Sequence, residues 1–381
     1  MITAPPPLSL YVHIPWCVRK CPYCDFNSHE PGGEIPEQAY LTALLADLDT
    51  ELEQVQNRSL ESIFFGGGTP SLFSPHGIGA ILDAAERHIG FAPDIEITLE
   101  ANPGTVEQAR FAGFRAAGVN RLSIGIQSFD NGHLQRLGRI HDRAAAIAAA
   151  RAARGAGFDN FNLDLMHGLP EQTPEQALAD LALAQDLGPA HLSWYQLTIE
   201  PNTVFHKRPP PLPDEDVLGD IQEAGEGVLR EAGFRQYEIS AWTTPGRESR
   251  HNLNYWQFGD YLGIGAGAHG KITWAGTDTI TRTSKTRAPA DYLAREDTWL
   301  AGSTAIAASE LPLEFMMNAL RLVDGVPPGF YPRRTGLDFA ALTDRWQRLR
   351  EQGLVRDPQE RLATTPLGLR YLNTVLTALA D

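Results

Sequence analysis

Cysteine is scarce in this 381-residue chain. Its three cysteines, Cys17, Cys21 and Cys24, all fall within one short stretch. A disulfide-stapled fold needs more cysteines, and an odd, tightly spaced set favours reduced thiols in a reducing compartment. The sequence also lacks an apolar run of the roughly 18 residues that a membrane helix needs. Its first residues show neither the basic start nor the apolar stretch of a secretion signal. These absences predict a cytoplasmic protein, and nothing in the sequence indicates contact with a membrane surface.

Positive charge is in short supply as well. The chain has 32 Lys and Arg against 47 Asp and Glu, a formal net charge of -15. Binding to a phosphate backbone needs clustered basic residues, so we expect no nucleic-acid partner. Residues 309–381 have a helical pattern like that of a winged helix, but their acidic and basic residues balance. That balance favours a surface that caps the fold or docks a partner over a DNA-binding surface.

The first two-thirds of the chain alternates short apolar runs with helical patterns. The helical patterns cover residues 36–55, 76–90, 105–118, 143–157 and 173–188. The candidate strands cover residues 8–15, 60–68, 94–102, 119–127, 158–168 and 191–199. Such alternation predicts a parallel sheet with crossover helices. Polar residues recur at the carboxyl ends of these strands, which favours a barrel, where those ends converge, over a doubly wound sheet.

The rest of the chain divides into two further parts. A Pro-rich connection at 200–216 leads to a helix at 216–232 and a strand at 234–240, and residues 250–270 look like an irregular, functional loop. Two amphipathic helices, a hairpin-like segment and a last helix follow, at 310–325, 338–353, 354–365 and 366–379. We therefore expect a barrel core at 1–200, a connecting region at 201–308 and a C-terminal domain at 309–381.

The three cysteines form a C-x3-C-x2-C motif after the first predicted strand. A structural zinc needs four ligands, and His13 or His29 completes such a set, so zinc is one alternative. A [4Fe–4S] cluster usually takes four cysteines, so three thiolates leave one iron without a protein ligand. An open position on a metal is where chemistry occurs, and we infer that a small molecule binds that iron.

This motif resembles that of the radical S-adenosylmethionine (SAM) superfamily, in which an aromatic residue, here Tyr23, precedes the last cysteine. The resemblance implies that SAM chelates the fourth iron and that an electron from the cluster cleaves SAM. The glycines of GGGTP, residues 66–70, let a backbone approach a polar ligand closely, and the family contacts the SAM amino group there. The implied fold is α/β, a partial (β/α)6 radical SAM barrel followed by a small, mainly α, winged-helix-like C-terminal domain.

The resemblance extends over nearly the whole chain. YVHIPWC, FFGGGTPSL, EANPGT, NRLSIGIQSF, LGRIHD and NLDLMHGLPEQT resemble oxygen-independent coproporphyrinogen III dehydrogenases and, more closely, the related HemW family of heme chaperones. Arg139 suits the SAM carboxylate, since guanidinium pairs with carboxylates in a bidentate geometry. Carboxylate and amide groups suit the ribose hydroxyls, although such residues at strand ends also serve as helix caps or core amides. The resemblance implies that SAM is bound by Tyr11, Tyr23, Gly67, Gly68, Thr69, Glu100, Gln127, Arg139 and Asp164.

Two departures separate the chain from the dehydrogenases. Phe26 stands where they carry a fourth cysteine, and their longer arm before the motif is here reduced to residues 1–10. HNLNYW, residues 251–256, matches the H-N-x-x-Y motif that the chaperone family associates with heme. Histidine and tyrosine both ligate heme iron, so His251 and, second, Tyr255 are candidate ligands. A plain hydrogen-bonded network is the alternative for this motif, and further candidate ligands are His167, His206 and His269.

The sequence therefore supports one leading hypothesis and two alternatives. In the first, the protein binds a [4Fe–4S] cluster through its three cysteines, together with SAM and heme, and transfers heme to acceptor proteins. In the second, it is an enzyme, a radical SAM oxidoreductase such as a coproporphyrinogen III dehydrogenase. In the third, it is an electron carrier that does not bind SAM. No residue is assigned a catalytic role.

Overall fold

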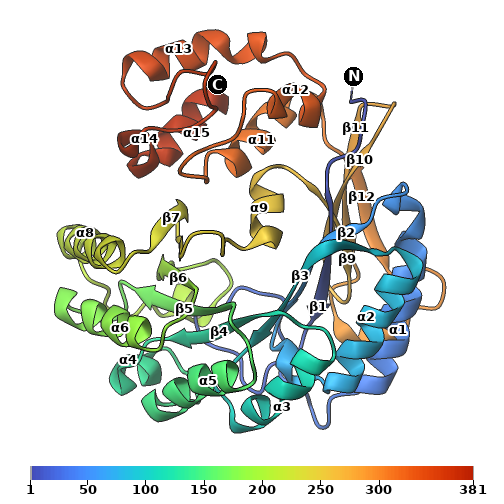
Figure 1. Cartoon of the computed structure of the whole chain (residues 1–381), viewed down its shortest axis with the longest axis vertical. Helices are drawn as coiled ribbons and strands as arrows, with labels where there is room; N and C mark the ends of the chain where they lie inside the picture. The colour runs from blue at the N-terminus through green and yellow to red at the C-terminus, as the bar shows by residue number, and fades with distance from the viewer. Residues whose placement is uncertain (1, 381) are drawn as a thin grey trace.

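A twelve-stranded mixed sheet forms the centre of the computed structural model, which describes residues 2–380 (Figure 1). Six parallel strands lie side by side in chain order, as the sequence predicted, so their carboxyl ends share one edge. The sheet stays open, because other strands extend both of its sides. The six parallel strands are β1 (Leu8–Ile14), β2 (Leu60–Gly67), β3 (Phe91–Ala101), β4 (Arg121–Gln127), β5 (Phe161–His167) and β6 (His191–Gln196).

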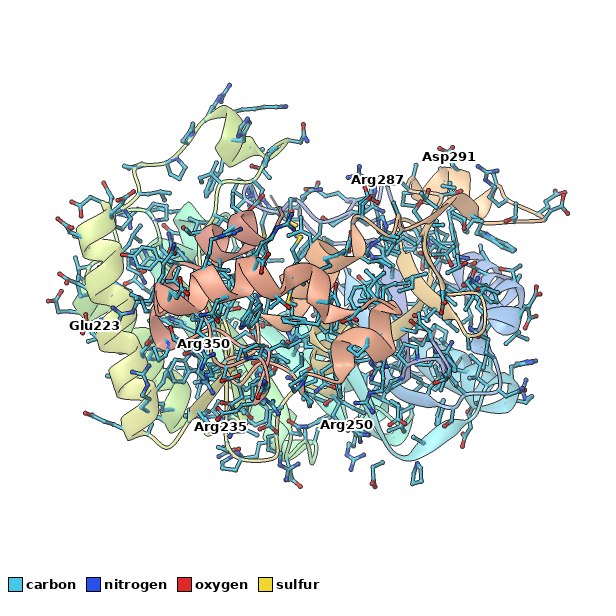
Figure 2. All side chains as sticks on the ribbon, turned by 90° about the horizontal axis from the view of Figure 1, so that it is seen from above. Glu223, Arg235, Arg250, Arg287, Asp291 and Arg350 are labelled. Atoms are coloured by element: carbon cyan, nitrogen blue, oxygen red, sulfur yellow. The ribbon has the colours of Figure 1, made fainter. Side chains whose placement is uncertain are left out.

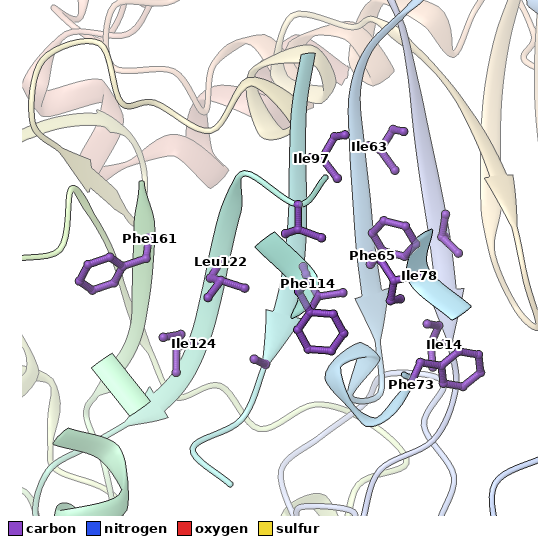
Figure 3. Close-up of a cluster of buried hydrophobic side chains, with 14 of the residues drawn as sticks. Ile14, Ile63, Phe65, Phe73, Ile78, Ile97, Phe114, Leu122, Ile124 and Phe161 are labelled. Carbon is purple, nitrogen blue, oxygen red and sulfur yellow. The ribbon is translucent and has the colours of Figure 1, made fainter. Parts of the chain in front are cut away.

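Helices cover the outer face of this curved sheet (Figure 1). The five predicted crossover helices are present, and a short sixth one, α4, was not predicted. Apolar side chains of the strands pack against them in one continuous core, which Figure 3 shows from Ile14 across to Phe161. The helices are α1 (Glu37–Glu51), α2 (Pro75–His88), α3 (Thr105–Ala116), α4 (Asn131–Arg136), α5 (Arg143–Gly155) and α6 (Pro174–Asp186), with 3-10 turns at Leu52–Val55 and Pro70–Leu72.

The connecting region adds strands to both sides of the sheet. The predicted helix and strand correspond to α8 (Glu215–Glu231) and β7 (Arg235–Glu238), and β7 pairs with β8 (Ala241–Thr243) beyond β6. On the other side, β9 runs parallel to β1, and three antiparallel strands follow it. The remaining elements of this region are α7 (Val204–Lys207), α9 (Arg250–Trp256), β9 (Asp260–Ile264), β10 (His269–Trp274), β11 (Thr279–Lys285), α10 (Pro289–Leu293) and β12 (Leu300–Ala305).

The prediction of an irregular loop at residues 250–270 was wrong. This segment contains helix α9 and strand β9. The Ser249 hydroxyl accepts a hydrogen bond from the Asn252 N–H and so caps the helix. The helix is too short to show a helical period, and Asp260 and Gly263 interrupt the apolar pattern of β9. Both elements are held by packing against β1 and β2, which local sequence does not reveal.

The C-terminal helices lie across the end of the sheet at which the parallel strands begin (Figure 1). They share a second apolar core with Ile2, Tyr237 and Phe258. Within the hairpin-like segment Val355 and Thr364 form an isolated bridge, and Leu362 forms another with Val326. The last predicted helix is interrupted at Tyr371. This domain contains α11 (Leu311–Ala319), α12 (Phe330–Thr335), a 3-10 turn at Phe339–Leu342, α13 (Thr343–Glu351), α14 (Pro366–Arg370) and α15 (Leu372–Ala380).

The architecture leaves the carboxyl edge of the parallel strands uncovered by the C-terminal helices. The loops that follow β1 to β5 meet there, and every residue predicted for the cluster and for SAM, apart from Tyr11 within β1 and Asp164 within β5, lies in them or at the adjoining strand ends. None of the helices in residues 2–380 combines the length and the apolar composition that crossing a bilayer requires.

Candidate functional site

The cysteine loop joins β1 to α1 and is fixed at its base by backbone hydrogen bonds. The Cys17 N–H donates to the His29 carbonyl at 3.0 Å, and the His29 N–H donates to the Pro15 carbonyl at 2.7 Å. A tight turn, in which the Cys24 N–H donates to the Cys21 carbonyl at 3.1 Å, brings the last two cysteines together. The loop therefore holds its thiols in a small region beside the strand ends.

Each of the three sulfur atoms lies within hydrogen-bonding distance of a different polar side chain. Thr69 Oγ1 donates to Cys17 Sγ at 3.5 Å, and Arg139 Nη1 donates to Cys21 Sγ at 3.5 Å. Ser28 Oγ lies 3.7 Å from Cys24 Sγ. Hydrogen bonds to sulfur stabilise thiolate ligands of iron–sulfur clusters and tune their potentials. Burial raises the pKa of the Cys17 and Cys24 thiols, so thiolates form here when a metal displaces the protons.

Both histidines proposed as a fourth zinc ligand make hydrogen bonds within the cysteine loop and β1. His13 Nε2 contacts the Asn27 carbonyl at 2.9 Å, and His13 Nδ1 contacts the Tyr11 hydroxyl at 3.0 Å. His29 Nε2 contacts Asn27 Oδ1 at 3.1 Å. In residues 2–380, no three His, Cys, Asp or Glu side chains are placed to hold a single metal ion. Three thiols with their own hydrogen-bond donors fit a [4Fe–4S] cluster that leaves one iron open.

A chain of side-chain hydrogen bonds connects two of the sulfurs. Thr69 Oγ1 accepts from Asn102 Nδ2 at 2.8 Å, and Asn102 Oδ1 accepts from Arg139 Nη2 at 2.6 Å. Arg139 Nε is buried without a partner among the described residues, so it retains one donor for a ligand. The sequence prediction included Thr69 and Arg139 and omitted Asn102. Its position after the third strand, in EANPGT, was the signal that could have identified it.

A cavity of about 340 Å³ opens between the cysteine loop and the strand ends. The structure brings nearly all of the predicted cluster and SAM residues to its wall. Tyr11 is the exception, because it lines a second, neighbouring cavity of about 700 Å³. The predicted residues that line the first cavity are Cys17, Cys21, Tyr23, Cys24, Gly67, Gly68, Thr69, Glu100, Gln127, Arg139 and Asp164.

The glycines of GGGTP let β2 end in close contact with the segment before the cysteines. Gly67 has a φ of +113°, and a Cβ there would lie 2.5 Å from the His13 ring. At Gly68 a Cβ would lie 2.5 Å from the Trp16 carbonyl oxygen. Side chains at these positions would push the loop away from the cysteines, so the fold itself requires both glycines, whatever ligand they contact.

The far wall of this cavity is a polar network on β4, β5 and β6. Gln127 has a φ of +67°, rare for a residue with a side chain, and its Oε1 accepts from the Tyr195 hydroxyl at 2.9 Å. The Asp164 carboxylate accepts from Ser123 at 3.0 Å and from Asn162 at 2.7 Å. Sequence reasoning missed Ser123, Asn162 and Tyr195. Their alternating positions along the strands, which point into the barrel, were the available signal.

Glu100 and Asp164 both line the cavity and cap no helix, since Gly104 and Thr173 occupy the caps of the helices that follow. Burial, and then the negative charge of Asp164, raise the pKa of Glu100 to about 8, against an opposing hydrogen bond from the Gly67 N–H. Burial likewise raises the pKa of Asp164. Glu100 is therefore mostly protonated at neutral pH, and its carboxyl group can donate as well as accept hydrogen bonds.

We expect Glu100→Gln to flatten the dependence of stability on pH. Because the folded chain binds the Glu100 proton more tightly than the unfolded chain, this group's contribution to stability falls as pH rises from about 5 to 8. The amide removes that loss, which is roughly 4 kcal/mol at pH 8. Urea unfolding at several pH values measures it, with Glu86→Gln, an exposed residue of α2, as the control. Equal pH slopes in wild type and Glu100→Gln would contradict the assignment.

The predicted heme motif forms most of helix α9, which packs against β1 and β2. His251 is 1% exposed, and its Nδ1 contacts Ser62 Oγ at 2.9 Å while its Nε2 contacts the Tyr255 hydroxyl at 3.0 Å. Burial, and then the nearby Arg121, lower the pKa of His251 to about 3. Asn254 completes this network through Ser9 Oγ, at 2.9 Å. The motif therefore forms the hydrogen-bonded network that was the alternative to heme binding. Heme ligation by His251 and Tyr255 stays a prediction.

The other candidate histidines occupy different environments. His167 is buried against Trp194, with a distance of 4.3 Å between ring centroids. His206 is exposed on α7 and lines neither cavity. His269 lines the second cavity together with Tyr255. Tyr255 therefore reaches a cavity and His251, one turn away, does not.

Comparison with known sequences identifies relatives over the full length. The chain matches the Radical SAM superfamily over residues 11–184 and the HemN C-terminal domain over residues 306–371. It is 52% identical over 375 residues to the heme chaperone HemW of Haemophilus influenzae, with 97% of each chain covered. The heme chaperone HemW of Escherichia coli K12 is 50% identical over 371 residues, again with 97% of each chain covered. Mouse radical S-adenosyl methionine domain-containing protein 1, mitochondrial, is 39% identical over 385 residues, with coverage of 97% and 87%.

Comparison with solved structures confirms the predicted fold class. Coproporphyrinogen III oxidase HemN from Escherichia coli, described as a radical SAM enzyme, matches with a TM-score of 0.83. The match covers 99% of this chain and 91% of that one at 23% identity. At this identity the similarity establishes the radical SAM α/β fold with its separate C-terminal domain, and it does not extend to the reaction.

Proposed function

The chain belongs to the HemW family of heme chaperones within the radical SAM superfamily, and from this we propose that it binds a [4Fe–4S] cluster, SAM and heme and delivers the heme to acceptor proteins. Sequence identity of 52% over nearly the full chain is the observation that carries the proposal. The match to the radical SAM superfamily supports the cluster and SAM. We further propose a cytoplasmic location, in accord with reduced cysteines.

Cys17, Cys21 and Cys24 are the residues that would hold the cluster. When bound, the cluster supplies an electron to the SAM sulfonium, and the family uses this pair for radical chemistry. Arg139 supports the proposal because its guanidinium is buried between Cys21 and Asn102 with Nε unpaired, where a carboxylate ligand gains a charge-assisted hydrogen bond. The carboxyl, amide and hydroxyl groups on β3 to β6 supply partners for ribose hydroxyls.

Phe26 favours the chaperone over the dehydrogenase. It stands two residues after Cys24, is 62% exposed and lines both cavities, so the position is accessible and carries no thiol. An exposed aromatic ring offers an apolar face to a planar ligand, whereas a thiol offers redox chemistry. Coproporphyrinogen oxidation remains the second candidate function because the fold is shared with HemN.

Incubation of the anaerobically reconstituted protein with coproporphyrinogen, SAM and a reductant tests the two functions. We expect no protoporphyrinogen to form, and we expect a separate titration with hemin to saturate at one hemin per chain. Steady formation of protoporphyrinogen would overturn the chaperone assignment. Failure to bind hemin would do the same. A cluster spectrum that SAM does not change would favour the electron carrier.

A further inference from the structure

A second cavity, of about 700 Å³, lies beside the residues predicted to bind SAM. It lies between the cysteine loop and β9 to β11, and it shares Phe26, Gly67 and Glu100 with the smaller cavity. Its volume is within the range of ligand pockets. The shared wall means that a ligand in one cavity lies directly beside a ligand in the other.

One histidine in this cavity is free to bind a metal. His269, the first residue of β10, is exposed, and its side chain makes no hydrogen bond with any described residue. Burial, followed by the positive charges of Arg282 and Arg287, lowers its pKa, so the imidazole is neutral at pH 7. A neutral imidazole with an unshared nitrogen is the common protein ligand of iron in heme.

The walls of the cavity offer flat aromatic surfaces. Tyr255 and Tyr261 both line it, with their rings edge to face at a centroid distance of 4.5 Å. The Tyr255 hydroxyl is bonded to His251 Nε2, so the buried histidine fixes this ring against the cavity. Phe26 adds a third aromatic side chain from the cysteine loop. Such surfaces suit a large planar apolar ligand.

Arg287, at the rim of the cavity, has a guanidinium group that can bind a carboxylate of a ligand. Arg287 is exposed, and its Nε donates to Asn27 Oδ1 at 3.2 Å, while both Nη atoms have no partner in residues 2–380. Lys285 also lines the cavity, but Asp47 and Glu51 already bind its ammonium. Figure 2 shows Arg287 on the edge of the molecule opposite Arg235 and Arg250. Arg287 is therefore the arginine of this rim that can pair with a bound anion.

We infer that heme, in the function proposed above, binds in this second cavity with His269 as the ligand of its iron. Tyr255, Tyr261 and Phe26 contact the macrocycle, and Arg287 pairs with a propionate. His251 is a positioning residue: it holds Tyr255 through a hydrogen bond and does not touch the iron. The inference rests on the proposed function and assigns its heme site.

Hemin titration of the full-length reconstituted protein, followed by absorption spectroscopy, tests the iron ligand. We expect His269→Gly to weaken hemin binding at least tenfold and to change the Soret band, and free imidazole to restore the wild-type spectrum. His206→Gly, which alters an exposed histidine outside the cavity, is expected to bind as wild type does. We expect His251→Ala to weaken binding and to keep the wild-type Soret position, because His269 still ligates the iron. Cluster absorption and circular dichroism establish that each variant is folded.

Hemin and its dimethyl ester together test the propionate contact. We expect Arg287→Ala to weaken hemin binding about tenfold and to leave binding of the ester unchanged. Arg235→Ala, on the opposite edge of the molecule, is expected to affect neither ligand.

Each failure has a separate meaning. If wild type binds hemin and His269→Gly binds it with the same affinity and spectrum, the inference is wrong and the proposed function stands. A wild-type spectral change that disappears in His251→Ala and persists in His269→Gly assigns the iron to His251 and also overturns the inference. If wild type binds no hemin, the proposed function itself fails.

Discussion

Cys21→Ser is expected to abolish assembly of the iron–sulfur cluster. The chain has no cysteine beyond the three of the motif, so no other thiol replaces the lost ligand. A serine hydroxyl is a harder and less acidic donor than a thiolate and binds cluster iron poorly. The Arg139 guanidinium, which donates to Cys21 Sγ at 3.5 Å, would then face a neutral hydroxyl. Anaerobic reconstitution, followed by iron analysis and absorption near 400 nm, measures the loss.

Two matched variants show whether the loss is specific. Ser28→Ala removes only the hydroxyl that lies 3.7 Å from Cys24 Sγ, and we expect the cluster to assemble with a shifted potential. Phe26→Cys adds a thiol two residues after Cys24, and we expect cluster content to stay the same because three thiolates suffice. A Cys21→Ser protein with wild-type iron content and a spectrum that responds to SAM would show that Cys21 is not a ligand.

Lys285→Met is expected to destabilise the fold by about 3–5 kcal/mol, because it strips the counter-ion from two buried carboxylates. Lys285 Nζ donates to Asp47 Oδ1 and to Glu51 Oε1, each at 2.5 Å, and its side chain is 1% exposed. The Tyr292 hydroxyl also donates to Asp47, at 2.7 Å. The cluster ties α1, which follows the cysteine loop, to β11. Urea unfolding of wild type and variant gives the difference in free energy.

A partly exposed ion pair supplies the comparison for Lys285. Arg230 lies 2.6 Å from Glu226 on α8, and its side chain is 58% exposed. Arg230→Met is expected to cost less than about 1 kcal/mol, because water and salt already screen the pair. Comparable losses in the two variants would mean that the buried charges contribute no more than the exposed ones. In that case the interior around Asp47 would be solvated.

The sequence allowed the six parallel strands and the cysteine loop to be predicted because their signals are local. Short apolar runs alternate with helical patterns, and three cysteines in one loop require no tertiary information. The strands β9 to β12 were not foreseen, since Gly263 and its neighbours interrupt the apolar pattern and the pairing partner β1 lies about 250 residues away. A strand of this kind is specified by the sheet that accepts it.

The site shows the same division between local and distant information. Arg139, Thr69 and Asp164 stand in short motifs through which the family resemblance implied them, and the structure places them at one cavity. The burial of His251 depends on Ser62, a residue of β2 nearly 190 positions earlier, so no local pattern reveals it. A motif gives the type of residue present, and only the packed fold determines which of its atoms remain free.

The parallel pairing of β1 with β9 bears on the order of events during synthesis. β1 leaves the ribosome first, but one of its two sheet neighbours, residues 260–264, is made only after two-thirds of the chain. The contacts that fix the cysteine loop and α1 to the later part of the chain need residues made later still: Asn27 donates to the carbonyls of Ala266 and Arg287, and Asp47 binds Lys285. Strand pairings between distant segments form late in folding. The thiols are therefore exposed on an incomplete sheet throughout most of translation, and iron loading is expected to follow release of the finished chain.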